Sequence, residues 1–109
     1  MTFNDYQQQT NKTAIYPSRG NNFIYPVLGM LGEAGEVAEK IKKIWRDKNN
    51  IISQEDSLEI KKEMGDVLWY LSQLATELKL DFDDVAQTNI LKVNSRLARN
   101  KLNGSGDNR

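Results

Sequence analysis

The stretch GMLGEAGEVAEKIKKI (residues 29–44) decides the fold, because it joins a helical apolar period to an unusual crowding of acids. Apolar residues recur at steps of three and four from Val27 to Trp45, which is typical of an amphipathic helix. Glu33, Glu36 and Glu39 nevertheless follow one another at three-residue spacing, where like charges repel by about 0.2–0.5 kcal/mol per pair. The stretch therefore predicts a helix whose crowded carboxylates need an explanation.

The N-terminal part of the chain predicts one short helix and a loop before this stretch. A first helix is expected from Phe3 to about Ile15, with Thr2 as its N-cap. Residues 16–26 (YPSRGNNFIYP) contain both prolines of the chain, a glycine and an Asn pair, which together predict a loop. The second helix is expected to start with Pro26 near its first position and to end around Lys48.

Two more helices are predicted by capping signals. Ser53 is followed three residues later by Asp56, an acidic variant of the capping box, so a third helix should begin after Ser53. Asp81 is expected to cap a fourth helix, with Asp84 at its third position. No segment alternates in the manner of a half-buried strand.

Four amphipathic helices predict an all-α, four-helix bundle. We expect one domain over residues 1–103, followed by a polar, Gly-rich tail at 104–109 that by composition should be disordered. Trp69 falls about opposite the apolar line of its helix. An exposed Trp there indicates either an oligomer interface or a scattered surface aromatic.

Composition excludes several classes of function. The chain has 109 residues, a formal net charge of zero, no cysteine and no histidine. Zero net charge argues against binding to nucleic acid or to an anionic membrane by bulk electrostatics. Thiol and imidazole chemistry are absent, so any metal must be held by oxygen ligands, which favours magnesium, manganese or calcium. With no apolar run of membrane-spanning length and no leader pattern, a cytoplasmic protein is expected.

A second acidic pair at the same spacing, in EMGD (residues 63–66), follows on the next helix. Glu63 falls on the edge of that helix's apolar stripe, where an unpaired carboxylate is costly to desolvate. Neither Glu33 nor Glu63 has a lysine three or four residues further on. Two antiparallel helices that each carry such a pair can place four carboxylates around one site, which then requires a divalent cation. The alternative is a solvated face with ordinary pairs from Glu36 to Lys40 and from Glu39 to Lys43.

The fourth helix supplies the opposite charge on one flank. Asn89, Lys92, Arg96 and Arg99 recur there at steps of three, four and three. Beside an acidic metal site, such a flank suits a polyphosphate, because the cation neutralises some oxygens while Lys and Arg bind the others. A solvated basic face is the alternative.

The motifs GEAGEVAEKIKK and KEMGDVLWYL resemble the MazG-like all-α nucleoside triphosphate pyrophosphohydrolases, whose signature is E-x-x-E followed by E-x-x-D. The resemblance covers roughly residues 25–100 and extends to an N-x-x-K element at Asn89 and Lys92, with Arg96 following. It implies an oligomeric bundle, a homodimer or homotetramer, that cleaves (d)NTP between the α- and β-phosphates to (d)NMP and pyrophosphate. The implied cofactor is Mg²⁺, with Mn²⁺ as the substitute, and the implied metal ligands are Glu33, Glu36, Glu63 and Asp66.

The resemblance also implies roles for single residues. One acidic residue near the metal helps to activate water in such enzymes, and Glu36 is the residue we nominate as that base. Asn89, Lys92 and Arg96 are the implied substrate-binding residues. Tyr70 corresponds to a position near the nucleotide in some relatives, although a core tyrosine is the alternative.

Two other functions remain open at this stage. Phosphoribosyl-ATP pyrophosphohydrolase has the same bundle, but its second motif typically runs into a Tyr-His pair, and this chain has no histidine. A non-catalytic helical interaction module of the same fold is the other, and it would be marked by degraded acidic positions. All four acidic positions are intact.

Overall fold

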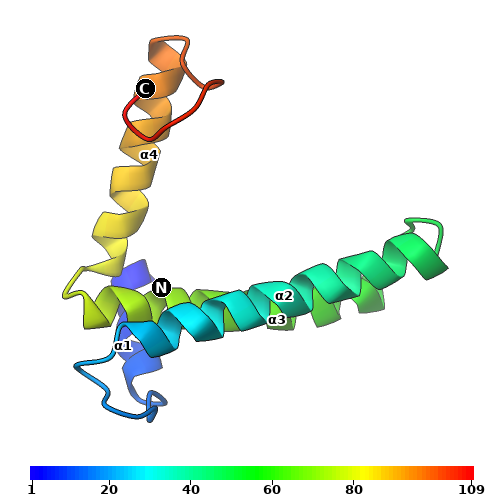
Figure 1. The fold of residues 1–109 in the computed structure, drawn as a ribbon, viewed down its shortest axis with the longest axis horizontal. Helices are drawn as coiled ribbons and strands as arrows, with labels where there is room; N and C mark the ends of the chain where they lie inside the picture. Colours follow the sequence, from blue (N-terminus) through cyan, green and yellow to red (C-terminus); the bar gives the residue numbers. More distant parts are fainter.

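The computed structural model describes residues 1–109 as four helices without a strand (Figure 1). This confirms the all-α class predicted by the sequence. The helices are α1 (Phe3–Asn11), α2 (Ile24–Asp47), α3 (Gln54–Glu77) and α4 (Phe82–Ala98). None of them is both long and apolar enough to cross a membrane.

Helices α1 and α3 begin at the N-caps that the sequence predicts, Thr2 and Ser53, and both of them form capping boxes. In α1 the Thr2 hydroxyl accepts from the Asp5 N–H at 2.9 Å, and the Asp5 carboxylate accepts from the Thr2 N–H. Ser53 and Asp56 form the same reciprocal pair at the start of α3. Each box satisfies two backbone donors that a helix N-terminus leaves unpaired.

The N-terminus of α4 is capped differently from the prediction. Asp81 is the N-cap residue, but its side chain makes no capping hydrogen bond. The side chains of Asn4 and Gln7 accept instead from the N–H groups of Asp83 and Phe82, at 2.9 and 3.0 Å. Helix α4 is therefore capped by α1, a contact between residues 75 or more positions apart that no local pattern reports.

Helix α1 ends at Asn11, four residues before the predicted end. The hydroxyls of Thr10 and Thr13 donate to main-chain carbonyls of α1, at Gln7 and Thr10. Such bonds compete with the helical ladder and favour termination. Helix α2 begins at Ile24, two residues before Pro26, which is accommodated in the first turn because the first N–H groups of a helix lack partners.

The arrangement is an antiparallel pair, α2 and α3, with α1 packed against α3 and with α4 leaving the corner at a steep angle (Figure 1). No contact joins α4 to α2. The radius of gyration is 16.7 Å, against about 13 Å for a compact chain of this size. A single chain therefore leaves the bundle open along one side.

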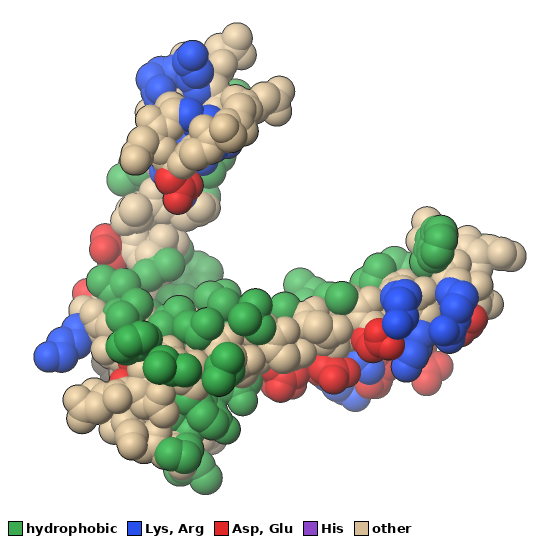
Figure 2. Space-filling model, viewed as in Figure 1, with side chains coloured by type: hydrophobic (Ala, Val, Ile, Leu, Met, Phe, Trp, Pro, Cys, Tyr) green, Lys and Arg blue, Asp and Glu red, His purple; other side chains and the backbone are tan.

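The uncovered side is apolar. Hydrophobic side chains gather along α2 and in the corner where α4 departs (Figure 2). A groove of about 390 Å³ there is lined entirely by apolar residues of α2 and α3: Ala34, Val37, Met64, Val67, Leu68 and Leu71. The few fully buried residues lie elsewhere, chiefly at the junction of α1 and α3, where Ser72 and Gln73 are each hydrogen-bonded to the Thr10 hydroxyl.

Candidate active site

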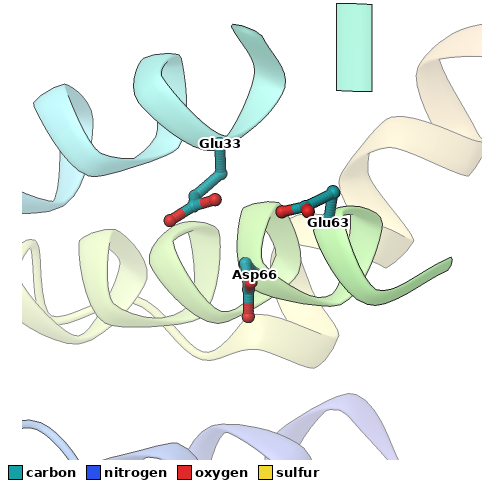
Figure 3. Close-up of side chains that lie close together, drawn as sticks. All are labelled: Glu33, Glu63 and Asp66. Carbon is teal, nitrogen blue, oxygen red and sulfur yellow. The ribbon is translucent and has the colours of Figure 1, made fainter. Parts of the chain in front are cut away.

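Three of the four predicted metal ligands lie together. Glu33 projects from α2 towards α3, where Glu63 and Asp66 lie one turn apart (Figure 3). One carboxylate oxygen from each of the three falls within 4.8 Å of the others. Glu36 lies one turn along α2 from Glu33, is exposed, and stands outside this group. The α2–α3 pairing is what joins residues 30 positions apart into the acidic cluster, defined here as Glu33, Glu63 and Asp66.

The acidic cluster is electrostatically crowded at Glu33. Burial raises the pKa of the Glu33 carboxyl, and the nearby charges of Asp66, Glu63 and Glu36 raise it further. Each of these effects disfavours the ionised form. A cation placed among the three carboxylates would offset their repulsion and favour the ionised form.

Glu63 has a counter-ion from the neighbouring helix, Lys40, which the spacing of charges in the sequence does not predict. The Lys40 ammonium of α2 lies 3.5 Å from a Glu63 oxygen. The expected pairs on α2 are therefore wrong in detail: Lys40 pairs across the helices rather than with Glu36, and Glu39 pairs with Lys42 at 2.7 Å rather than with Lys43. The reason is that α3 lies beside α2, which offers Lys40 a carboxylate that is already half-buried.

A pocket of about 370 Å³ opens beside the acidic cluster. Its lining residues are Thr13, Glu33, Asp66, Trp69 and Tyr70. The pocket thus combines two carboxylates with two aromatic rings, the mixture of polar and apolar surface that binds small molecules with one charged end. Burial raises the pKa of the Tyr70 hydroxyl, as do the neighbouring Tyr25, Glu33 and Asp66.

Trp69 is half-buried, so the predicted exposed Trp is wrong. Its Nε1 donates to the Thr13 hydroxyl at 3.0 Å, and its ring meets Tyr70 edge-on. The segment after α1 covers this side of α3. The apolar line of α3 alone does not predict this cover. Thr13 and Trp69 are the pocket residues that sequence reasoning missed, and the position of Trp69 away from the apolar line was the available signal.

The basic flank does not join the acidic cluster within one chain. Asn89, Lys92 and Arg96 all belong to α4, which has no contact with α2. Asn89 is exposed, Lys92 is half-buried, and Arg96 is buried beneath the C-terminal residues. The predicted substrate-binding residues of α4 and the predicted metal ligands are therefore on separate arms of the molecule (Figure 2).

Residues 26–99 match the family model described as the MazG nucleotide pyrophosphohydrolase domain. The chain belongs to the MazG family. A relative from Mycobacterium phage L5, named only "Gene 37 protein", is 45% identical over 109 residues, covering 95% of this chain and 96% of its own length. No solved structure gives a significant match.

The MazG match begins inside α2 and ends just after α4. It contains the acidic cluster, Glu36, Tyr70 and the basic flank. The match leaves out helix α1, the segment after it that contains Thr13, and the last ten residues. Both segments lie outside the matched residues, and each of them contacts a part of the candidate site.

Proposed function

We propose that this MazG domain is a magnesium-dependent nucleotide pyrophosphohydrolase that cleaves a (d)NTP between its α- and β-phosphates to (d)NMP and pyrophosphate. The observation that carries the proposal is the acidic cluster, in which Glu33, Glu63 and Asp66 come from two neighbouring helices to within 4.8 Å. The MazG family match supports the reaction class.

The donor set suits a hard divalent cation. Mg²⁺ and Mn²⁺ take oxygen ligands, and three carboxylates offer up to six oxygens and three negative charges. The raised pKa of Glu33 indicates that the crowding is unfavourable without a cation. A bound cation would offset the negative charge of the phosphates and increase the acidity of water.

Three further residues are proposed to supply the functions of the site other than metal binding: Glu36, Trp69 and Tyr70. Glu36 is exposed beside the cluster, where its carboxylate is free to join the ligands or to accept a proton from water. The aromatic rings of Trp69 and Tyr70 line the same pocket as Glu33 and Asp66. The pocket therefore has an apolar wall next to its two carboxylates. A nucleotide fits this arrangement with its phosphates at the carboxylates and its base or sugar at the rings.

The proposed assembly is a homo-oligomer, with a homodimer as its smallest form. The apolar groove on α2 and α3 has no cover within one chain, and an exposed patch of this kind marks an interface. The basic flank of α4 has no carboxylates beside it from α2. A second copy that packs its helices on the groove would cover the patch and complete the site with a basic flank.

The test is a panel of NTPs, dNTPs and modified nucleotides incubated with Mg²⁺ and scored by pyrophosphate release. The expected result is pyrophosphate from at least one nucleotide, lost on chelation and restored by Mg²⁺ or Mn²⁺. If no nucleotide in the panel yields pyrophosphate with either metal, the proposed function is wrong.

A further inference from the structure

The last ten residues form a fastened loop on α4, which we call the C-terminal strap (residues 100–109). The Arg109 guanidinium donates to the carbonyls of Lys101, Leu102 and Gly106, at 3.2, 3.0 and 2.6 Å. Gly104 and Gly106 adopt φ values of +127° and +83°, which glycine tolerates far better than other residues. The strap therefore closes on itself through specific bonds, in contrast to the disorder that its composition predicts.

Arg96 fastens the strap to α4. Its side chain is 8% exposed, and its Nη2 donates to the main-chain oxygen of Asp107 at 2.7 Å. Its Nε is buried without a hydrogen-bond partner. Because the strap lies over the guanidinium, Arg96 does not contact a ligand directly. It anchors the strap instead.

The anchored strap places a carboxylate beside Lys92. Asp107 Oδ1 lies 3.3 Å from Lys92 Nζ and 3.4 Å from Arg96 Nη2. The hydrogen bonds from Lys92 and Arg96 hold the pKa of Asp107 below its usual value. The carboxylate itself is 82% exposed, whereas the side chain of Lys92 is 38% exposed, so both groups face the solvent at one spot.

We propose that Asp107 is a positioning residue that holds the Lys92 ammonium in place for the polyphosphate of the substrate. The inference rests on the proposed function, because it assigns Lys92 to the phosphates. A lysine side chain loses rotamer entropy when a ligand fixes it. A partner that already restricts the ammonium reduces that loss at the moment of binding.

The alternative is that Asp107 imitates a phosphate and must leave before the substrate binds. The fastening of the strap argues against this. Displacing it would break the bonds made by Arg109 and the bond from Arg96 to the Asp107 carbonyl. The main chain of Asp107 therefore stays on α4. If its carboxylate alone rotated away before the phosphates bound, Asp107→Asn would bind polyphosphate more tightly, and the experiment below measures this.

The experiment compares Asp107→Asn with Asp47→Asn as the matched control. Asp47 forms an exposed ion pair with Arg46 near the end of α2, away from the basic flank. Asp107→Asn keeps the main-chain bond to Arg96 and the three Arg109 bonds, so the strap should stay folded. We expect KM to rise about three- to tenfold, with kcat changed less than twofold and Tm unchanged. Asp47→Asn should leave all three unchanged.

Two further measurements separate this role from a structural one. Calorimetric titration of inorganic tripolyphosphate with Mg²⁺ should show the same weakening without any need for turnover. In a Lys92→Met background, Asp107→Asn should cause no further rise in KM and no further loss of tripolyphosphate binding, because the two residues act as one unit. Unchanged or tighter binding in Asp107→Asn overturns the inference, and so does an undiminished effect in Lys92→Met. A chain that shows this binding pattern but releases no pyrophosphate would overturn the proposed function alone.

Discussion

Glu33 is the residue that links α2 to the acidic cluster. It is the only member of the acidic cluster on α2, and its pKa is raised by the charges of Asp66, Glu63 and Glu36, whereas Glu63 pairs with Lys40. Its raised pKa means that the folded protein binds a proton there more readily than the unfolded chain does. Ionised Glu33 therefore lowers the stability of the metal-free fold as pH rises through its folded pKa.

Glu33→Gln should consequently have opposite effects on stability and on metal binding. At pH 7.5 with chelator present, we expect the free energy of unfolding to rise by roughly 0.5–1 kcal/mol, because a like-charge contact is removed. Calorimetric binding of Mn²⁺ should be lost. Glu39→Gln is the matched control, since Glu39 pairs with Lys42 outside the cluster and its loss should not stabilise the protein. A destabilised Glu33→Gln that still binds Mn²⁺ would refute the assignment.

Gly29 is the second residue with a specific steric role. A Cβ at this position would overlap the ring of Tyr70, so only glycine lets Tyr70 lie against α2. Alanine in a helix interior usually stabilises it by about 1 kcal/mol relative to glycine. We expect Gly29→Ala instead to lower the free energy of unfolding by about 1–3 kcal/mol, through displacement of Tyr70. Gly32→Ala, with open space around its Cβ, should be stabilising in the same denaturant titration.

At the scale of elements, the sequence predicted the helices that carry the site better than it predicted their surroundings. The capping boxes at Thr2 and Ser53 are local patterns, and the structure has both. The cap of α4 is made by Asn4 and Gln7, and the partner of Glu63 is Lys40. These contacts join residues far apart in the chain, so they depend on how the helices pack. The spacing of residues along the sequence does not determine that packing.

The loop between α1 and α2 is held by Glu77, near the end of α3. The Tyr16 hydroxyl and the N–H groups of Gly20 and Asn22 all donate to its carboxylate. Burial raises the pKa of Glu77, but these hydrogen bonds outweigh it, so the pKa lies below the usual 4.5. Because the folded pKa is lowered, this stability is present above pH 4.5 and is lost as pH falls through the folded value.

Glu77→Gln should therefore destabilise the protein in a pH-dependent manner. At pH 7 we expect a loss of about 1–3 kcal/mol, typical of hydrogen bonds to a charged group. The difference from the wild-type chain should shrink as the pH is lowered from 4.5 towards 3, in urea titrations monitored by circular dichroism. A difference that stays constant across this range would show that the charge of Glu77 is not what holds the loop.

For the whole molecule, the open shape is the main feature that the sequence did not predict. Four amphipathic helices predicted a four-helix bundle but not the angles between its helices; in the structure α4 points away from α2 and the apolar groove remains uncovered. Periodicity identifies which face of a helix is apolar. It does not identify whether the partner of that face belongs to the same chain, because the burial is equally favourable in both cases.

The assembly can be tested by placing a charge in the groove. Met64→Lys should shift the protein from an oligomer to a monomer in size-exclusion chromatography with light scattering, because a buried unpaired ammonium is costly. Activity should fall with the oligomer, since the basic flank would no longer reach the carboxylates. Ile15→Lys is the control, because Ile15 is 92% exposed outside the groove and should leave the oligomer intact. A wild-type chain that is monomeric at micromolar concentration would contradict the proposed assembly.

The most direct test of the central claim is a product analysis of wild-type protein and Asp66→Asn side by side, with the nucleotide that the panel identifies. We expect one pyrophosphate per nucleoside monophosphate with Mg²⁺, none with chelator, and a rate more than about 100-fold lower in Asp66→Asn at unchanged helicity. Release of orthophosphate in place of pyrophosphate, or an Asp66→Asn variant as active as the wild type, would contradict it.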